Sequence, residues 1–184
     1  MDNGASSYRR YLDGDDNGMV EIIKDYKDGL TLYINGFVKN IYTAEELMEE
    51  TFVKLATKRP RFGGKSSFKT WIFAIARNLT LDYLRKNKRL CQNPIDENDL
   101  SAEEADVESQ YLKKEQSILL HRTMQKLNTE YFQVLYLIYF EGFTNSETAS
   151  VMKKNNRQIE NLVYRAKSAL RTMLEKEGFR YEEL

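Results

Sequence analysis

The chain has 184 residues, and its 28 Lys and Arg residues balance 28 Asp and Glu residues to a formal net charge of zero. This balance excludes a uniformly basic nucleic-acid coat, and the 41% of hydrophobic residues exclude a wholly disordered chain. The single cysteine, Cys91, excludes an intrachain disulfide and a cysteine-based zinc cluster. The apolar runs fall far short of the ~20 residues that span a bilayer, so we expect a soluble, cytoplasmic protein without a transmembrane segment.

The first 90 residues have the periodicity of helices. We expect a short helix around Tyr8–Leu12, and Thr43-Ala-Glu-Glu46 matches a capping box that predicts a helix start. Phe73 lies off the apolar stripe of the helix that follows Phe68, so that helix suits a central position, packed by neighbours or covered by a partner. Two stripes recur with a period near 3.6: Leu47, Met48, Thr51, Phe52 and Leu55, then Phe68, Trp71, Ile72, Ile75, Leu79 and Tyr83.

Charge divides the chain into two parts. Residues 58–89 carry ten basic side chains against the single acid Asp82, whereas seven acids and no base occur from Asp96 to Glu108. Pro94 opens this acidic stretch, whose early part lacks helical periodicity. We therefore interpret residues 91–108 as an acidic linker between two helical domains.

The C-terminal part matches a helix-turn-helix. Thr144-Asn-Ser-Glu147 is a capping box, Asn155-Asn-Arg-Gln158 is a looser one, and Ser101-Ala-Glu-Glu104 is a further candidate in the linker. Ala149 provides the small side chain needed where two helices cross. One more apolar stripe precedes this motif and two lie within it: Phe132, Leu135, Tyr136 and Tyr139; Thr148, Ala149 and Met152; Ile159, Leu162, Val163, Ala166 and Leu170.

The second helix of this motif carries side chains that can read base edges. Arg donates a bidentate pair to guanine, Asn pairs with adenine, and Glu accepts from cytosine. The alternative is an amphipathic helix with a solvated charged face. The turn carries Lys153 where such turns usually have Gly. The candidate base readers are Arg157, Glu160, Asn161, Tyr164 and Arg165, and the candidate phosphate contacts are Lys153, Lys154, Lys167 and Arg171.

Catalytic motifs are missing from the sequence. His121 is the only histidine, and we expect it to be a half-exposed helix residue. Without a nucleophile–base pair or a metal-ligand cluster, we expect no enzyme activity, no cofactor, no metal and no small-molecule substrate.

Two further stretches are ambiguous by their chemistry alone. The loop Lys58–Ser67 mixes bases, glycines and Phe62, which suits single-stranded nucleic acid or a flexible exposed turn. The helix with Glu45, Glu46, Glu49 and Glu50 on one side suits protein docking or a solvated face.

Three segments in order carry a family resemblance. They are Ala44-Glu-Glu-Leu-Met-Glu-Glu-Thr-Phe52, Phe68-Lys-Thr-Trp-Ile-Phe-Ala-Ile-Ala-Arg-Asn78 with Asp82 and Arg85, and the helix-turn-helix that ends Tyr164-Arg-Ala-Lys167. Together they resemble an extracytoplasmic-function (ECF) sigma factor of bacterial RNA polymerase, over roughly residues 17–90 and 109–175. The resemblance implies an all-α fold, with sigma region 2 in residues 1–90 and sigma region 4 in residues 109–184.

The resemblance also implies partners and their contact residues. Region 2 would dock on the β′ clamp helices of core polymerase through Glu46, Glu49 and Glu50, with Leu47 and Phe52 as support, and region 4 would lie at the β flap. The family pattern usually has Asp and Gln where this chain has Glu46 and Glu49. Members are often held inactive by an anti-sigma factor, and no residue here shows whether this chain has one.

Promoter DNA is the other partner that the resemblance implies. Region 4 would read the −35 element through the candidate base readers listed above. Region 2 would open the −10 element and hold a flipped base. Unstacking that base costs free energy, which stacking and hydrogen bonds in the pocket must offset. The matching positions are Phe62, Gly63, Gly64, Lys65, Ser66 and Asn78. The acidic linker would run toward the RNA-exit channel.

The competing hypothesis is a conventional dimeric helix-turn-helix regulator. Residues 1–90 would then be a sensing or dimerisation domain, and the dimer would bind a palindrome without polymerase. A nucleic-acid enzyme is a third class, which the missing metal-ligand cluster and base make the weakest.

Overall fold

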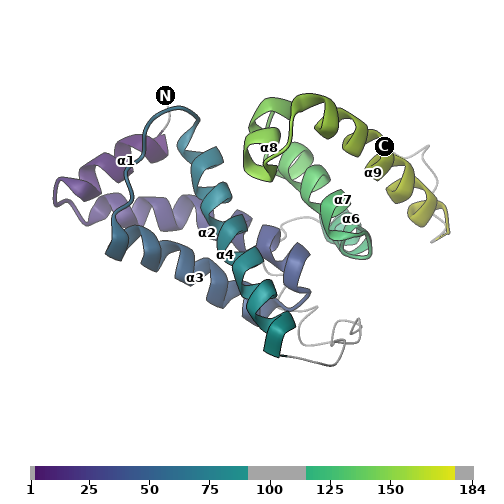
Figure 1. The fold of residues 1–184 in the computed structure, drawn as a ribbon, viewed down its shortest axis with the longest axis horizontal. Helices are drawn as coiled ribbons and strands as arrows, with labels where there is room; N and C mark the ends of the chain where they lie inside the picture. Colours follow the sequence, from purple (N-terminus) through teal and green to yellow (C-terminus); the bar gives the residue numbers. More distant parts are fainter. Residues whose placement is uncertain (1–2, 91–114, 177–184) are drawn as a thin grey trace.

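The computed structural model describes residues 3–90 and 115–176, and these residues form helices and connecting turns with no strand among them. The linker at residues 91–108, with Cys91 and the candidate cap at Ser101, lies outside the described residues. In chain order (Figure 1) the helices are α1 (Asn3–Leu12), α2 (Asn17–Val38), α3 (Ile41–Lys58), α4 (Phe68–Leu90), α6 (Glu115–Gln125), α7 (Thr129–Leu135), the π-helix η1 (Tyr136–Phe140), α8 (Asn145–Met152) and α9 (Asn156–Lys176).

Helices α1 to α4 form an N-terminal unit around the long helix α2. Helix α2 packs against α1, α3 and α4, and its C-terminal turns, from Leu30 to Phe37, are buried on several sides. The predicted α3 stripe, Leu47 to Leu55, faces this core and is buried as expected. Ile22 and Ile34 of α2, Leu55 of α3 and Ile72 of α4 are fully buried. The hydrophobic effect of closing these stripes on one another stabilises the unit.

Helix α1 confirms the short helix expected at Tyr8–Leu12 and extends it back to Asn3. The Tyr8 ring lies 5.5 Å from Phe68 and 5.4 Å from Trp71, and its hydroxyl donates to the Pro60 carbonyl oxygen at 2.8 Å. Burial raises the pKa of the Tyr8 phenol to about 12, so it remains a donor at neutral pH. This hydrogen bond fixes the loop before α4 to the first helix of the chain.

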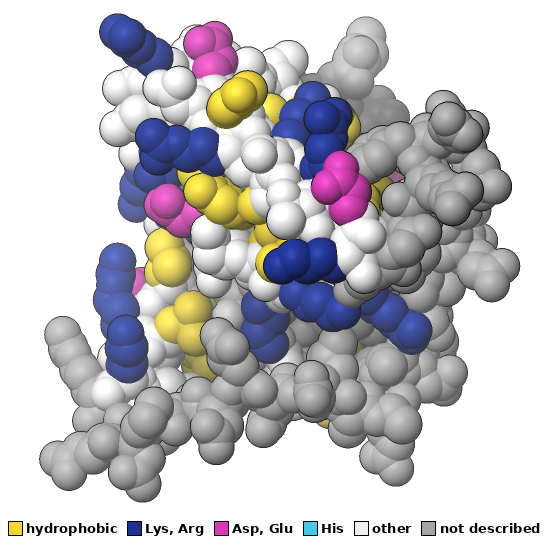
Figure 2. Space-filling model, turned by 90° about the vertical axis from the view of Figure 1, so that its right-hand side faces the viewer, with side chains coloured by type: hydrophobic (Ala, Val, Ile, Leu, Met, Phe, Trp, Pro, Cys, Tyr) yellow, Lys and Arg dark blue, Asp and Glu magenta, His cyan; other side chains and the backbone are white. Residues whose placement is uncertain are grey.

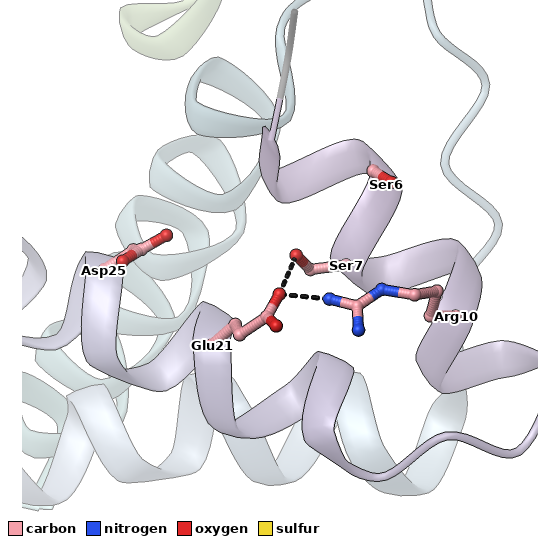
Figure 3. A pocket seen from close by; sticks show the side chains of 5 residues that line it. All are labelled: Ser6, Ser7, Arg10, Glu21 and Asp25. Atoms are coloured by element: carbon pink, nitrogen blue, oxygen red, sulfur yellow. Dashed lines mark hydrogen bonds and ion pairs between the residues drawn. The ribbon is translucent and has the colours of Figure 1, made fainter.

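A polar cluster joins α1 to α2 at the rim of a cavity of about 270 Å³. Ser7 donates to the Glu21 carboxylate at 2.6 Å, and the Arg10 guanidinium pairs with the same carboxylate (Figure 3). Hydrogen bonds to the carboxylate lower the pKa of Glu21, and the bond from Arg10 has a larger effect than the bond from Ser7. Ser6 and Asp25 complete the lining. Ser7 and Arg10 of α1 both bind Glu21 of α2, so the cluster holds the two helices together.

Helices α6 to α9 form a C-terminal unit in which α9 packs across α6, α7 and α8. Between α7 and α8 the chain widens to a π-helix, where the Glu141 N–H donates to the Tyr136 carbonyl oxygen at 3.1 Å. The predicted stripe is therefore only partly right. Phe132, Leu135 and Tyr136 are buried, but the wider turn leaves Tyr139 53% exposed.

The prediction that His121 is half-exposed is wrong. This side chain is fully buried in the C-terminal unit. Its imidazole meets Phe132, Tyr136 and Phe140 edge-on, with ring centroids 5.5 to 5.9 Å apart. These three rings stack along α7 and η1 and cover the inner face of α6, because residues four apart in a helix share one side.

The two units pack directly on each other, α8 against α4 and α7 against α2 (Figure 1). Phe73 of α4 meets Phe143 with ring centroids 5.3 Å apart and an interplanar angle of 72°. This contact confirms that α4 is apolar on more than one side because neighbours cover it. A single hydrophobic cluster therefore runs through both units.

The helix caps agree with the sequence at two of three described sites. Thr144 and Glu147 form a full capping box, and Asn155 and Gln158 exchange backbone-to-side-chain bonds of 2.9 and 2.8 Å. The predicted cap at Thr43 is wrong. The extended residue Asn40 caps α3 instead, and its side-chain oxygen accepts from the Thr43 N–H at 2.8 Å.

A pair of substitutions distinguishes these two starts of α3. We expect Asn40→Ala to lower the free energy of unfolding by about 1 kcal/mol, because it leaves a backbone N–H of the first turn without its cap. Thr43→Ala should change it by less than about 0.5 kcal/mol, since Thr43 lies within the helix, where Ala is the better former. Urea denaturation followed by circular dichroism measures both, and a larger loss for Thr43→Ala would contradict the assignment.

Candidate promoter and polymerase interfaces

The candidate base readers lie along one exposed face of α9. The spacing of Arg157, Glu160, Asn161, Tyr164 and Arg165 follows the helix repeat, and each of these residues is exposed. Tyr164 is 77% exposed, which is unusual for so large a ring. On the opposite side, Ile159 and Ala166 are buried against the rest of the unit. The helix is thus held by its apolar side while a polar and aromatic face remains open.

The four candidate phosphate contacts differ in their surroundings. Lys153, Lys167 and Arg171 are exposed, and the Lys167 ammonium lies 5.0 Å from the centroid of the Tyr139 ring. Lys154 is half-buried and forms an ion pair with Glu130 at 3.0 Å. The side of the molecule on which α9 lies shows more basic than acidic side chains (Figure 2). This imbalance suits a phosphate backbone.

The tight turn between α8 and α9 takes the left-handed conformation that the sequence pattern requires. Lys153 ends α8 with φ 55° and ψ 47°, and its N–H donates to the Ala149 carbonyl oxygen. A non-glycine residue here is strained by about 1 kcal/mol. The turn geometry is therefore kept without glycine, and the lysine side chain is exposed.

The candidate single-strand site begins with the loop before α4. Gly63, Gly64 and Lys65 are exposed, and Gly64 has a φ of +67°, which favours glycine. Phe62 is half-buried, with its ring 5.2 Å from Trp71 and 5.6 Å from Phe68. The ring is thus held by an aromatic cluster rather than free in solvent, with only part of its surface open.

Asn78 lies on α4, away from that loop along the helix. It is half-buried and lines a cavity of about 390 Å³ between α4 and α8. The other lining residues are Arg77, Leu81, Asp82, Arg85, Met152 and Lys153. Residues from both predicted DNA-binding units thus share one cavity. Ser66 lies half-buried just before α4.

The candidate docking helix α3 presents two distinct faces. Glu46, Glu49 and Glu50 are exposed, whereas Leu47 and Phe52 are buried in the N-terminal unit. Tyr42 and Val53 are large apolar residues that are also exposed on this helix. The acidic groups are therefore available to a basic partner while the apolar ones fix the helix.

Sequence reasoning missed the polar residues that join the two units. The Gln133 side-chain oxygen accepts from the Arg77 Nε at 3.0 Å, and Lys69 pairs with Glu141 at 2.8 Å. No local signal marks such residues, because each forms its bond with a residue more than 50 positions away in the chain. Glu147, which accepts from Ser67 and Thr70 of the N-terminal unit, did stand out in the sequence, but as part of the capping box at Thr144.

Comparison with known proteins agrees with this arrangement. The family pattern of Sigma-70 region 2 matches residues 22–90, and that of Sigma-70 region 4 matches residues 117–170. Both matches fall on the described helices, the first on α2 to α4 and the second on α6 to α9. The chain belongs to the sigma-70 family of RNA polymerase sigma factors, which direct core polymerase to promoters and help open the DNA.

Its relatives define the group within that family. The ECF RNA polymerase sigma factor SigX of Bacillus subtilis is 24% identical over 82% of this chain and 80% of its own length. RNA polymerase sigma-H factor of Pseudomonas aeruginosa is 28% identical over 85% of this chain and 86% of its own. The chain is an ECF sigma factor.

Solved structures share its fold. CnrH, solved in complex with the cytosolic domain of CnrY, has a TM-score of 0.63 and 20% identity and covers 95% of this chain and 96% of its own. RpoE from Bartonella quintana, solved with the anti-sigma factor NepR, has the same TM-score with 19% identity, over 84% of this chain and 95% of its own. Both likenesses concern the fold alone.

The capping carboxylate Glu147 should make stability depend on pH. The Thr144 backbone N–H, then its hydroxyl and those of Ser67 and Thr70, lower the pKa of Glu147. Because the folded pKa lies below the unfolded value of about 4.3, this stabilisation is present above pH ~4.3 and is lost as pH falls through the folded pKa. We expect Glu147→Gln to cost about 0.5–1 kcal/mol of unfolding free energy at pH 7.

Urea denaturation at pH 7 and pH 3 measures this effect. The difference between the native protein and Glu147→Gln should shrink at the lower pH, because the stabilisation that depends on the carboxylate charge is lost as pH falls through the folded pKa. Glu175→Gln, at an exposed position near the end of α9, is the control and should change stability little at either pH. A difference that stays constant down to pH 3 would show that charge plays no part.

Proposed function

We propose that this sigma factor recognises promoters with two surfaces on separate units. Residues 109–184 act as region 4, and the open face of α9 reads the −35 element in the major groove. The observation that carries this proposal is the exposed row of Arg157, Glu160, Asn161, Tyr164 and Arg165 on a helix whose other side is buried. Lys153, Lys167 and Arg171 contact phosphates around it, and Lys154 joins them when its ion pair with Glu130 opens.

Residues 1–90 act as region 2 and hold the −10 element as a single strand. The loop of Gly63, Gly64, Lys65 and the half-buried Ser66 lets backbone approach the strand closely. Phe62 offers the part of its ring that is exposed, and Asn78 reads a base edge. Lys65 supplies a positive charge for phosphate. Residues 91–108 are the acidic linker that leads toward the RNA-exit channel.

Helix α3 is the docking helix for the β′ clamp of core polymerase. Its support comes from three exposed glutamates, Glu46, Glu49 and Glu50, above the buried Leu47 and Phe52. Charge complementarity would orient the partner on α3 and raise the rate of association. Region 4 lies at the β flap in the same assembly.

The protein works as a non-enzymatic initiation factor, and we propose that it does so in the cytoplasm, where its polymerase partner lies. Among the described residues no helix is long and apolar enough to cross a membrane. CnrH and Bartonella RpoE were each solved with a bound partner, and for RpoE that partner is an anti-sigma factor. By analogy, an anti-sigma factor is a proposed partner of this chain.

Binding to core polymerase tests the docking assignment. We expect the purified chain to co-elute with bacterial core RNA polymerase, and Glu46→Lys/Glu49→Lys to weaken this association at least about tenfold, because like charges then face each other. Glu21→Lys is unsuitable as a control because Glu21 binds Arg10, so Asp25→Lys, on the exposed side of α2, serves instead. Direct binding of a palindrome by a dimer, without polymerase, would favour the conventional regulator.

Two DNA-contact variants should fail at different steps. Arg165→Ala should lower promoter occupancy by the holoenzyme about 10- to 100-fold, because one good base contact contributes ~1–3 kcal/mol of discrimination. Asn78→Ala should leave occupancy nearly intact but reduce melting of the −10 region. Footprinting measures the first and permanganate reactivity the second. Equal behaviour of the two variants in both assays would contradict the division of labour.

A further inference from the structure

Helix α1 lies outside the part of the chain that matches the Sigma-70 region 2 pattern. The match begins at residue 22, within α2, whereas α1 spans Asn3–Leu12. The family assignment therefore gives α1 no role. In the structure, the loop between α3 and α4 runs past α1 (Figure 1), and Tyr8 of α1 donates a hydrogen bond to it. This loop, residues 59–67, contains Phe62 and the glycines of the proposed single-strand site.

Tyr11 of α1 binds the end of α3, where the chain enters this loop. Its hydroxyl donates to the Ala56 carbonyl oxygen at 3.2 Å. In a continuing α-helix the donor to this oxygen would be the residue four positions on, but that residue is Pro60, which has no N–H. The Tyr11 hydroxyl thus satisfies an acceptor that the helix end leaves open, and it fixes the place where α3 stops.

Arg59 then turns the chain sharply out of α3. Its φ of 41° lies in the left-handed region, which is strained for a residue with a Cβ atom. Its guanidinium carbon lies 5.3 Å from the centroid of the Tyr11 ring. Because a cation is attracted to the face of an aromatic ring, Tyr11 helps to hold this strained turn.

Tyr8 fixes the next step of the loop. Its hydroxyl donates to the Pro60 carbonyl oxygen at 2.8 Å, and its ring packs on Phe68 and Trp71. The same two rings hold Phe62, with centroids 5.6 and 5.2 Å away. Tyr8 thus holds both the backbone two residues before Phe62 and the rings on which Phe62 rests.

Helix α1 is itself held in place, because two glycines let it lie close to its neighbours. At Gly4 of α1, a Cβ atom would lie 2.5 Å from an atom of the Phe68 ring. At Gly18 of α2, a Cβ atom would lie 2.2 Å from the Ser7 carbonyl oxygen of α1. The hydroxyl groups that α1 presents to the loop are therefore held in fixed positions.

The loop needs such support, because its own residues do little to fix its shape. Gly63 and Gly64 are exposed, and a Cβ atom added at either would meet nothing within 4 Å. Glycine also loses the most conformational freedom when it is ordered. The order of the loop must therefore come from its two ends. Ser67 fixes the far end by accepting from the Thr70 N–H at 3.1 Å, and α1 fixes the near end.

We propose that α1 is a positioning element for the single-strand site, in which the Tyr8 and Tyr11 hydroxyls hold the chain before Phe62 in the shape that receives the unpaired strand. This inference rests on the proposed function of residues 1–90 and deepens it. Both tyrosines are buried, so they act through the backbone of residues 56 to 60 and not by touching DNA. A loop that already has its bound shape loses less conformational entropy on binding, which raises its affinity.

Four conservative substitutions test this role. Tyr8→Phe removes the hydrogen bond to the loop and keeps the ring in its aromatic cluster. Tyr11→Phe does the same for the bond to the end of α3, and it decides the question if Tyr8→Phe does not fold. Tyr131→Phe, at a half-buried tyrosine of α7, is the matched control for the chemical change. Ile22→Val, at a fully buried residue of α2, is the control for a general loss of stability in the same unit.

The probe is a single strand selected by the holoenzyme. The native chain with core polymerase selects from a pool of short random single strands, after strands that bind core polymerase alone have been removed. Fluorescence anisotropy then gives the affinity of each variant holoenzyme for the selected strand. We expect Tyr8→Phe and Tyr11→Phe each to weaken binding about fivefold, the equivalent of one neutral hydrogen bond, with core polymerase bound as before. Tyr131→Phe and Ile22→Val should bind the strand as the native chain does.

The only tryptophan of the chain reports the shape of the loop without any partner. The Trp71 ring lies 5.4 Å from that of Tyr8 and 5.2 Å from that of Phe62. In the free chain, quenching of its fluorescence by acrylamide should increase in Tyr8→Phe, because the loop opens more often. It should stay at the native level in Ile22→Val. Circular dichroism shows that each variant is folded.

The outcomes separate this inference from the function on which it rests. Native affinity for the strand in folded Tyr8→Phe would overturn the positioning role. An equal loss of affinity in Ile22→Val would also overturn it, since general stability alone would then explain the effect. If the native holoenzyme selects no single strand, the proposed single-strand function is wrong, and the positioning role fails with it.

Discussion

Much of this structure depends on one contact, the Phe132 ring seated on the bare backbone of Gly36. On one side the ring continues the stack of Tyr136 and Phe140 that encloses His121. On the other, the missing Cβ lets α7 approach α2 closely enough for Tyr136 to reach a main-chain carbonyl. The aromatic core of one unit is thereby joined to the helical core of the other. The polar bonds around it fix the register of the joint, because each buried donor must keep its acceptor.

A second constraint acts on α3 and α9. Each helix must be stable although one of its faces packs against nothing else in the described chain. Both helices solve it in the same way, with apolar residues at helical spacing on one side and charged or polar residues on the other. The buried side fixes the direction in which the exposed side points. That division allows the glutamates of α3 and the candidate base readers of α9 to face solvent without loss of stability. Helix α4 differs, since neighbours cover it on several sides.

How far the sequence could predict the structure depends on whether a feature is local. The Thr144 box, the α3 stripe and the helix-turn-helix were predictable, because caps and periodicity act within one or two turns. The start of α3 was not, since Thr43 and Asn40 are both good caps and the left-handed Lys39 before Asn40 decides between them. The burial of His121 and the bonds of Gln133 depend on partners far along the chain. Of the candidate sites, the exposed faces of α3 and α9 were predictable, whereas the cavity that Asn78 shares with Met152 and Lys153 was not.

The joint between the units combines an aromatic centre with polar groups at its edge. Rings such as Phe73 and Phe143 contribute steady apolar attraction, whereas exchangeable polar groups such as Lys69 and Glu141 can transfer to water or to a partner at little cost. Each polar pair has a defined partner, so it allows only one register of α4 against the C-terminal unit, whereas rings alone could slide on one another. Polar groups at the rim of an aromatic contact thus set how the two units are placed, while the exposed faces of α3 and α9 stay open.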